Sequence, residues 1–317
     1  MRTKDSTVSD ISQRILSQVR QVVVGKDNVL LWVLAAILAR GHILLEDVPG
    51  VGKTTMALAF SKVLSLDYSR VQFTPDVLPS DVTGYSIPDQ TTGALQYQPG
   101  AVLCNLFLAD ELNRATSRTQ SALLEAMEEG QVTVDGTTHK IPDPFVVIAT
   151  QNPTGAAGTS LLPDSQMDRF MVKLSLGYPS PRDEIAMVMN RQEGNPLHAL
   201  RPLVSRENLS EIQDMVADTY MNETVVAYLV TLISATRSHG DIARGASPRA
   251  TLAVTAMAKA VARLRGRDYV VPGDVREVFS QTVAHRLILS PRAEGQGRTP
   301  EQVLREILDA NPAPRLR

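Results

Sequence analysis

Apolar residues in the first half of the chain gather into short runs that are separated by helical patterns. Such runs predict strands that are buried on both faces, as the strands of a parallel sheet are. The helical pattern is clearest directly after Asp110. Strands that alternate with helices predict an α/β fold in which helices cover both faces of a parallel sheet. The expected strands span residues 42–47, 103–110, 144–150 and 170–176, with a weaker one at 68–73.

Three other segments of this half have patterns of their own. Residues 26–40 are apolar nearly all round, which predicts a buried helix. Residues 131–141 alternate around the pair Asp135-Gly136, which predicts a β-hairpin. Residues 93–100, in the long insertion after Phe73, resemble a second hairpin.

The second half of the chain has a different pattern of apolar residues, because strand-like runs stop near Ser180. Ser180, Ser247 and Thr299 each precede a proline, as a capping residue does at the start of a helix. Thr299 and Gln302 also match a capping box. The pattern predicts an α/β domain over residues 1–179 and an all-α domain over residues 180–317. Amphipathic helices are expected at 181–192, 207–220, 224–237, 248–265, 274–287 and 301–308.

Composition and charge exclude several classes of protein. The net charge of -2 and the pI near 6.2 argue against an electrostatic nucleic-acid binder. The single cysteine, Cys104, lies in an apolar run and is expected in the core. The longest apolar run, residues 29–39, is too short to span a bilayer. No apolar segment follows the first basic residues, so no signal peptide is expected and a cytoplasmic location is predicted.

The segment LLEDVPGVGKTT, residues 44–55, nearly matches the phosphate-binding pattern G-x-x-x-x-G-K-[ST]. Gly50 and Gly52 would let backbone N–H groups approach phosphates at a helix N-terminus. Lys53 would contact the β- and γ-phosphates, and the Thr54 hydroxyl would bind Mg²⁺. Asp47 stands where the first glycine is expected, and it is tolerable only if its carboxylate points away. The alternative is a tight strand-to-helix turn without a ligand.

The segment LFLADE, residues 106–111, predicts a buried strand that ends in two carboxylates. Asp110 could hold the water shell of Mg²⁺, and Glu111 could deprotonate an attacking water. Taken alone, the pair could also be two solvated loop carboxylates. Together with the phosphate loop, it predicts a Mg²⁺-dependent nucleotide hydrolase.

Three further polar residues are candidates for the same site. Asn152, in ATQNP (residues 149–153), follows the next apolar strand at the edge where such sheets bind ligands. Arg169 precedes the last strand, and Arg249 lies near a helix start in GASPRA, from where it could reach back to the nucleotide. A turn asparagine and two surface ion pairs are the alternatives for these residues.

The order of EDVPGVGKT, LADELNRA, ATQNP, LPDSQMDRF and GASPRA closely resembles the MoxR family of AAA+ ATPases, from about Val23 onward. The resemblance implies an αβα core followed by an all-α lid. It assigns Thr54 and Asp110 to Mg²⁺, and Val24 and Gly25 to contacts with adenine. The implied Walker A residues are Pro49, Gly50, Val51, Gly52, Lys53, Thr54 and Thr55.

The resemblance also implies catalytic roles for residues beyond the phosphate loop. Glu111 would complete Walker B, and Asn152 would be sensor 1. Arg169 would be an arginine finger that acts on a neighbouring subunit, and Arg249 would be sensor 2. The two hairpins would be the helix-2 insert and the pre-sensor-1 hairpin of this clade.

The implied activity is ATP hydrolysis with Mg²⁺ in a ring, typically a hexamer, that remodels or matures client proteins. A separate partner with a von Willebrand factor A domain is expected. Three alternatives remain: a nucleic-acid motor, a chelatase-type subunit that inserts metal, and a nucleotide-gated adaptor. The near-neutral charge and the lack of a nucleic-acid module argue against the first.

Overall fold

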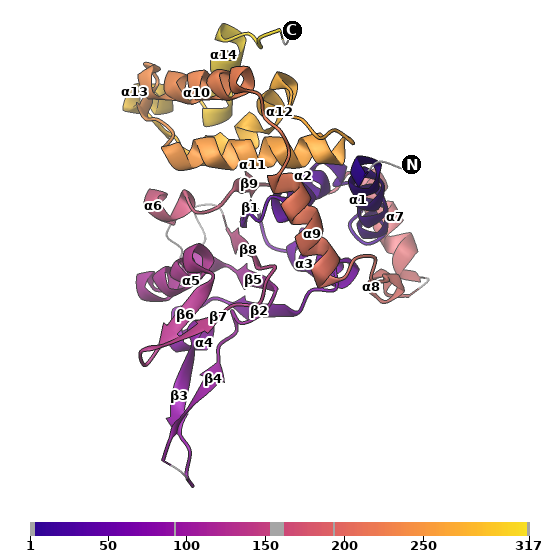
Figure 1. Cartoon of the computed structure of the whole chain (residues 1–317), viewed down its shortest axis with the longest axis vertical. Helices are drawn as coiled ribbons and strands as arrows, with labels where there is room; N and C mark the ends of the chain where they lie inside the picture. Colours follow the sequence, from indigo (N-terminus) through magenta and orange to yellow (C-terminus); the bar gives the residue numbers. More distant parts are fainter. Residues whose placement is uncertain (1–3, 92, 153–161, 193, 316–317) are drawn as a thin grey trace.

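A five-stranded parallel sheet forms the centre of the computed structural model, which describes residues 4–91, 93–152, 162–192 and 194–315 (Figure 1). The strand order is β2-β5-β8-β1-β9. All five predicted strands are confirmed, each within or close to its apolar run. Their bounds are β1 Ile43–Glu46, β2 Tyr68–Gln72, β5 Leu106–Asp110, β8 Val146–Gln151 and β9 Val172–Leu174.

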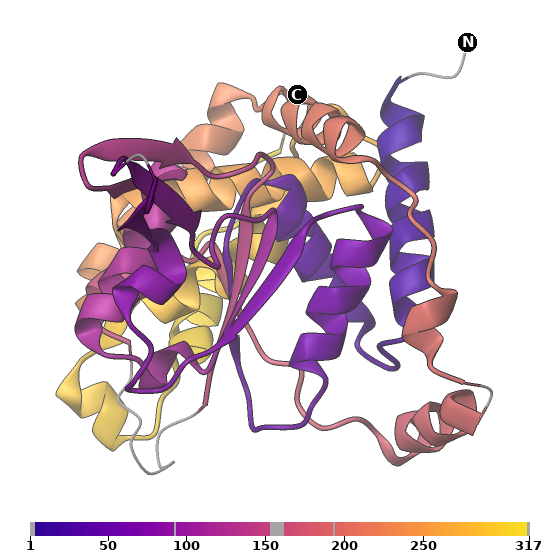
Figure 2. The same cartoon turned by 90° about the horizontal axis from the view of Figure 1, so that it is seen from below.

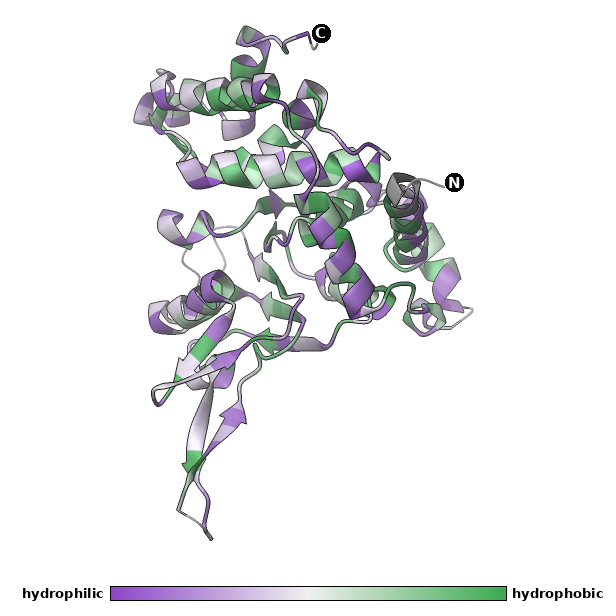
Figure 3. Ribbon diagram, viewed as in Figure 1, coloured by the Kyte–Doolittle hydropathy of each residue, from purple (hydrophilic) through white to green (hydrophobic). Residues whose placement is uncertain are grey.

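Helices cover both faces of this sheet, as the uninterrupted apolar strands require. Leu106 and Leu108 of β5 pack in one hydrophobic cluster, and Phe107 and Ala109 pack in another on the opposite face. Figures 1 and 3 show the apolar strands between these helical layers. The first cluster includes helices α1 (Lys4–Arg20), α2 (Asp27–Leu38) and α3 (Lys53–Val63), and the second includes α5 (Ser117–Glu129).

Two hairpins project from the α5 side of the sheet (Figure 1). In the first, β6 (Gln131–Val134) pairs with β7 (Thr137–Lys140), and the predicted turn residues Asp135 and Gly136 have φ of 49° and 77°. Positive φ at both central residues is the geometry of a type I′ turn. The other hairpin is larger than predicted. Residues 93–100 supply only its second strand, β4 (Leu95–Pro99), and β3 (Gly84–Pro88) follows helix α4 (Pro79–Thr83).

The C-terminal half is mostly helical, and the three predicted proline starts are confirmed at α7, α11 and α14. Both bonds of the predicted capping box form between Thr299 and Gln302. The expectation that strands stop near Ser180 was wrong, because β10 (Ile242–Arg244) pairs with β11 (Ile288–Leu289). Strands this short carry too few residues for a recognisable pattern. The helices are α7 Pro181–Gln192, α8 Pro196–Ala199, α9 Arg206–Ala217, α10 Glu223–Ser238, α11 Pro248–Leu264, α12 Pro272–Val283, α13 Pro291–Gly295 and α14 Pro300–Ala310.

Buried polar contacts join the C-terminal helices to the sheet. Arg286, in the 3-10 turn Ala284–Arg286, donates to the Phe170 carbonyl at 2.7 Å and to the Asp168 carbonyl at 2.8 Å, just before β9. Helix α9 packs against both α2 and α11. The division between residues 179 and 180 therefore stays a prediction, since helices beyond it contact both halves.

Cys104 is 5% exposed, which confirms that it is a core residue, and burial raises the pKa of its thiol to about 12. In the part of the chain that the structure describes, no helix combines the length and the apolar character that crossing a bilayer requires.

Candidate active site

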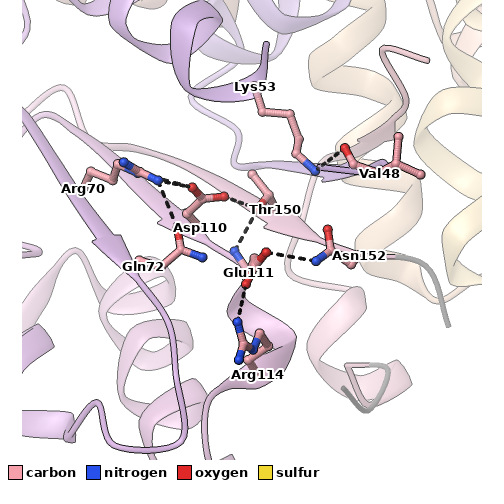
Figure 4. Close-up of polar contacts among 9 residues, drawn as sticks. All are labelled: Val48, Lys53, Arg70, Gln72, Asp110, Glu111, Arg114, Thr150 and Asn152. Atoms are coloured by element: carbon pink, nitrogen blue, oxygen red, sulfur yellow. Dashed lines mark hydrogen bonds and ion pairs between the residues drawn. The ribbon is translucent and has the colours of Figure 1, made fainter. Parts of the chain in front are cut away.

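The carboxyl ends of three neighbouring strands bring the predicted chemistry together at one edge of the sheet. The phosphate loop follows β1, the carboxylates of Asp110 and Glu111 end β5, and Asn152 follows β8 (Figure 4). Because β1 and β5 are the two neighbours of β8, the three strand ends lie side by side, and the Asn152 amide donates to the Glu111 carboxylate. Ligands bind at this edge in open α/β sheets.

The phosphate loop depends on two glycines with left-handed backbone geometry. Gly50 has φ of 86° and Gly52 has φ of 98°, and Gly52 is the N-cap of α3. A Cβ atom at either position would meet no protein atom within 4 Å, so the backbone here borders open space. The N-terminal N–H groups of α3 therefore form a concavity suited to an anion. Thr54 and Thr55 lie in the first turn of α3 and are partly buried.

Lys53 is 7% exposed and donates to the Asp47 carbonyl at 2.8 Å and to the Val48 carbonyl at 3.4 Å. Desolvation lowers the pKa of its ammonium group, against the opposing effect of the nearby Asp47, Asp110 and Glu111 carboxylates. The ammonium thus lies over the loop with backbone oxygens as its partners.

The carboxylate of Asp47 points away from the phosphate loop. The sequence required this orientation if the loop is to bind phosphate. Oδ2 accepts from the Leu176 N–H at 2.6 Å, and Oδ1 accepts from the Ser175 hydroxyl at 2.7 Å and the Gly177 N–H at 3.0 Å. Asp47 therefore ties the start of the loop to the segment that follows β9.

Asp110 is held by two residues that the sequence reading did not single out. Its Oδ1 accepts from the Thr150 hydroxyl at 2.7 Å, and its Oδ2 accepts from Arg70 Nε at 3.2 Å and Nη2 at 2.7 Å (Figure 4). A carboxylate has about four acceptor positions, so it can still bind water. Mg²⁺ is typically held by one or two protein oxygens, water and phosphates. The Thr54 hydroxyl and the Asp110 carboxylate fit that set.

Glu111 occupies a strained position with φ of 56°, in the left-handed region. The Thr150 hydroxyl accepts from its backbone N–H at 2.8 Å. Its carboxylate accepts from Arg114 Nη1 at 2.9 Å and from Asn152 Nδ2 at 3.0 Å (Figure 4). The Arg114 hydrogen bond is the main reason that the pKa of Glu111 is lowered. The carboxylate is therefore ionised and fixed in direction.

Asn152 lies where the sequence predicted, at the carboxyl edge, and it is 7% exposed. Its Oδ1 is buried and has no hydrogen-bond partner among the residues that the structure describes. Pro153, the end of the ATQNP motif, lies outside the described residues. The Asn152 side chain therefore donates to Glu111 through Nδ2, and its Oδ1 is available to accept a hydrogen bond.

A cavity of about 240 Å³ adjoins the phosphate loop. Its walls include Val24, Val51, Thr55 and Met187, so they are largely apolar, as a pocket for a nucleobase is. Gly25, with φ of 71°, lies beside this wall, and a Cβ there would come within 2.2 Å of Asp183 Oδ2.

The structure places the two candidate arginines elsewhere. Arg169 precedes β9 and Arg249 begins α11, and both form ion pairs with Glu128 at the end of α5, Arg169 at 3.2 Å. They line a second cavity of about 350 Å³ together with His42, which precedes β1. This is the amino edge of the sheet. From His42 to Asp47, at about 3.3 Å per residue, the two edges are roughly 16 Å apart. Arg249 does not reach back to the phosphate loop of its own chain.

The sequence did not predict a role for four residues at the two edges of the sheet: Arg70, Arg114, Glu128 and Thr150. Thr150 had a detectable signal, since a hydroxyl that ends an apolar strand lies beside the end of the neighbouring strand. Arg114 also had a local signal, because its partner Glu111 lies only three residues before it. The partners of Arg70 and Glu128 follow from strand pairing and helix packing, which no local pattern reports.

The comparisons with known proteins agree with this geometry. Residues 42–172 match the ATPase family associated with various cellular activities (AAA), and residues 234–307 match the AAA lid domain. YeaC of Bacillus subtilis is 44% identical over 95% of this chain and 94% of its own length. The chaperone MoxR1 of Mycobacterium tuberculosis is 39% identical over 96% of this chain and 82% of its own.

Solved structures show the same fold. A crystal structure from Cytophaga hutchinsonii, described as that of a candidate ATPase, superposes with a TM-score of 0.91 at 37% identity. It covers 98% of this chain and 97% of its own. A full-length MCM homologue from Methanopyrus kandleri, at 18% identity and a TM-score of 0.60, shares the fold alone. With the two family matches and relatives that align over nearly the whole chain, the protein belongs to the MoxR family of AAA ATPases.

Proposed function

We propose that this AAA ATPase hydrolyses ATP with Mg²⁺ in a ring of identical chains and uses the cycle to remodel client proteins. The observation that supports the catalytic assignment most directly is the meeting of Lys53, Asp110, Glu111 and Asn152 at one edge of the sheet. These residues come from separate elements and interact through hydrogen bonds and charge. Such a cluster beside an anion-binding helix start is a phosphoryl-transfer site in chemical terms.

Different residues of the chain would bind the phosphates, the Mg²⁺ and the adenine. The loop from Pro49 to Gly52 and the first turn of α3 would hold the phosphates through backbone N–H groups. Lys53 would exchange its carbonyl partners for phosphate oxygens. Thr54 and Asp110 would hold Mg²⁺, which when bound neutralises charge on the phosphoryl group in transfer. The cavity beside Val24 and Gly25 would take the adenine.

Glu111 would act as the general base for the attacking water. Its lowered pKa keeps the carboxylate ionised, as proton acceptance requires. In the resting geometry both carboxylate oxygens are occupied, by Arg114 and by Asn152. A carboxylate has about four acceptor positions, so each oxygen can still accept from a water while it keeps its present partner. Asn152, with its unpartnered Oδ1, would position that water.

Arg169 and Arg249 would act on the nucleotide of a neighbouring chain. Two guanidinium groups share the Glu128 carboxylate, so one positive charge is left uncompensated by it. Because both lie at the amino edge, a second copy must bring its own carboxyl edge to them. Such head-to-tail contacts generate a closed ring when the rotation closes, and a hexamer is the size that the resemblance implies.

Steady-state ATPase activity per chain, measured as protein concentration rises, tests this proposal. The expected result is a specific activity that climbs with concentration, and that stays low throughout in Arg169→Ala. A flat specific activity that Arg169→Ala leaves unchanged would mean that each chain works alone, and the ring proposal would then fail.

The remodelling role is supported by the relative that is named a chaperone. We further propose that a separate protein with a von Willebrand factor A domain delivers the client. Co-purification of that partner with the Glu111→Gln variant in ATP, and its loss in ADP, would support delivery. Equal recovery in both nucleotides would oppose it.

A further inference from the structure

We propose that Asp168 is a positioning residue through which the C-terminal helices of each chain hold Arg169 in the direction that ATP hydrolysis in the neighbouring chain requires. The inference rests on the proposed function, because it takes Arg169 to act on the nucleotide of a neighbour. It adds what sets the direction of that side chain, and it assigns this task to a carboxylate for which the sequence predicted no role.

Arg169 lies in a turn between helix α6 (Asp164–Met167) and β9. Its N–H donates to the Gln166 carbonyl at 3.2 Å, and the Phe170 N–H donates to the Met167 carbonyl at 3.2 Å. A helix of one turn is marginal without packing, since its first hydrogen bond fixes several dihedral angles at once. The direction of the Arg169 side chain therefore depends on contacts with other parts of the fold.

A single guanidinium group fixes the backbone on both sides of Arg169. Arg286 donates to the Asp168 carbonyl at 2.8 Å and to the Phe170 carbonyl at 2.7 Å, the carbonyls of the residues directly before and after Arg169. Its Nε donates to the Thr282 carbonyl at 2.8 Å, so the planar group is held in one orientation. Thr282 belongs to α12 and Arg286 to the turn after it, so this anchor comes from the C-terminal helices.

The Asp168 carboxylate keeps this guanidinium group in place. The Arg286 side chain is 2% exposed, and it forms an ion pair with Asp168 Oδ1. A buried charge that loses its partner is left uncompensated, which folded proteins tolerate poorly. Desolvation lowers the pKa of Arg286, and the charge of Asp168 opposes that effect. Asp168 thus holds Arg286, and Arg286 holds the backbone around Arg169.

The other oxygen of the same carboxylate contacts the helix that carries Arg249. Asp168 Oδ2 accepts from the Ser247 hydroxyl at 3.0 Å. Ser247 is the N-cap residue of α11, a position whose hydroxyl usually accepts from the first turn of the helix. No such bond joins it to the described first turn of α11, and the hydroxyl donates to Asp168. One carboxylate therefore ties two C-terminal segments to the turn that contains Arg169.

The wider packing places these contacts above the others in importance. In Figures 1 and 2, α11 and α12 lie on the side of the sheet where β9 is the edge strand. A second ion pair, between Arg244 and Asp164 at 3.1 Å, also joins α6 to the C-terminal half, but both side chains are more than half exposed. Exposed pairs contribute little to stability. The contacts of Asp168 with the buried Arg286 are therefore the main anchor.

The guanidinium group of Arg169 is paired with a different part of the fold, Glu128 at the end of α5, at 3.2 Å. When a phosphate of the neighbouring chain replaces Glu128, the backbone anchor decides where that group lies. An error of about 1 Å in such a position can lower a rate by about 10²-fold. Loss of the anchor should therefore lower turnover and leave the nucleotide affinity of the same chain unchanged.

Three variants test the anchor. Asp168→Asn removes the charge and keeps the shape of the side chain, and it should lower kcat by about 10- to 100-fold with the KM for ATP close to wild type. Ser247→Ala removes the bond to Oδ2 without removing a helix cap, so it should fold even where Asp168→Asn does not, and it should lower kcat by roughly 2- to 10-fold. Asp164→Asn makes the same chemical change at an exposed site of the same segment. It is the matched control, with kcat close to wild type.

Mixtures of chains separate a misdirected arginine from a damaged nucleotide site. ATPase activity is measured at a concentration where the specific activity of wild type no longer rises. A Glu111→Gln chain has a well-held Arg169 and no base, so mixing it with Asp168→Asn should restore part of the activity. An Arg169→Ala chain has a base and no arginine to supply, so mixing it with Asp168→Asn should restore little. Ser247→Ala should show the same pattern on a smaller scale.

Damage to the nucleotide site of the Asp168→Asn chain itself would give the reverse pattern, and would overturn the positioning role. So would activities of Asp168→Asn and Ser247→Ala that both equal that of Asp164→Asn. A mixture of Glu111→Gln with Arg169→Ala is the reference. If that mixture regains no activity, the arginine does not act on a neighbour, and the proposed function fails together with this inference. If it is active, a failure of the Asp168 variants concerns the positioning role alone.

Discussion

The two edges of one parallel sheet carry opposite chemistry in this protein. At the carboxyl edge, polar groups at the ends of β5 and β8 hold one another in a connected network around Glu111. At the amino edge, Arg169 and Arg249 share the single carboxylate of Glu128. The first edge contains two carboxylates and a glycine-containing loop at a helix start, which we propose hold Mg²⁺, the attacking water and the phosphates. In the group formed by Arg169, Arg249 and Glu128 at the second edge, there is one more positive charge than negative charge.

The difference teaches that the arginine pair and the phosphate loop lie on surfaces that cannot meet within one chain. Side chains do not span the roughly 16 Å of strand between the two edges. Whatever the arginines contribute to hydrolysis must therefore come from assembly. On the proposed function, assembly is therefore a condition for full ATPase activity.

The largest expected effect comes from removing an arginine at the amino edge. Arg169→Ala should lower kcat by about 10³- to 10⁵-fold, since an arginine supplied in trans contributes that much in related phosphoryl transfers. Binding of ATP should persist, because Lys53 and the loop are untouched. Arg244→Ala, which removes an exposed arginine paired with Asp164 at 3.1 Å, is the control. Equal losses in both variants would point to a general loss of stability.

Glu111→Gln tests the other edge. Loss of the general base should lower kcat by about 10²- to 10⁴-fold and leave nucleotide binding intact. Mixing Glu111→Gln with Arg169→Ala chains should restore part of the activity, because an intact base then faces an intact arginine across some interfaces. A mixture as inactive as its two components would show that both residues act within one chain.

Asp47→Gly should harm the protein although it restores the glycine of the general phosphate-loop pattern. The Leu176 and Gly177 N–H groups would lose their acceptor, so the free energy of unfolding should fall by about 2–4 kcal/mol. Urea unfolding measures the change, with Asp47→Asn as the milder control. A variant as stable as wild type would show that the carboxylate does not hold the loop to the segment after β9.

Arg114→Ala should give the smallest effect, a shift in pH dependence. The Arg114 hydrogen bond favours the ionised form of Glu111 and lowers its pKa. Without it the pKa rises, so on acidification activity should be lost at a higher pH than in wild type. The acidic limb of the kcat profile measures this, and Arg114→Lys should shift it less. An unmoved limb would mean that another group governs it.

The sequence predicted the carboxyl edge well because its chemistry is local. Gly50, Gly52, Lys53 and Thr54 form a contiguous pattern, and Asp110-Glu111 ends an apolar run. Their roles depend on backbone geometry over a few residues. The β3–β4 hairpin was predicted too small because Gly84–Pro88 lacks a clear alternation and the pairing partner decides its extent.

What the sequence by itself determined was the order of the strands of the central sheet and of the main helices, the helix starts at prolines, and the residues that we propose for nucleotide binding. Periodicity and turn chemistry encode these over short distances. Only the tertiary structure decided that Asp47 points away, that Arg70 and Thr150 hold Asp110, and that Arg249 lies beside Arg169. Those facts depend on strand order and on helices packed across the sheet, and a local pattern carries no information about either.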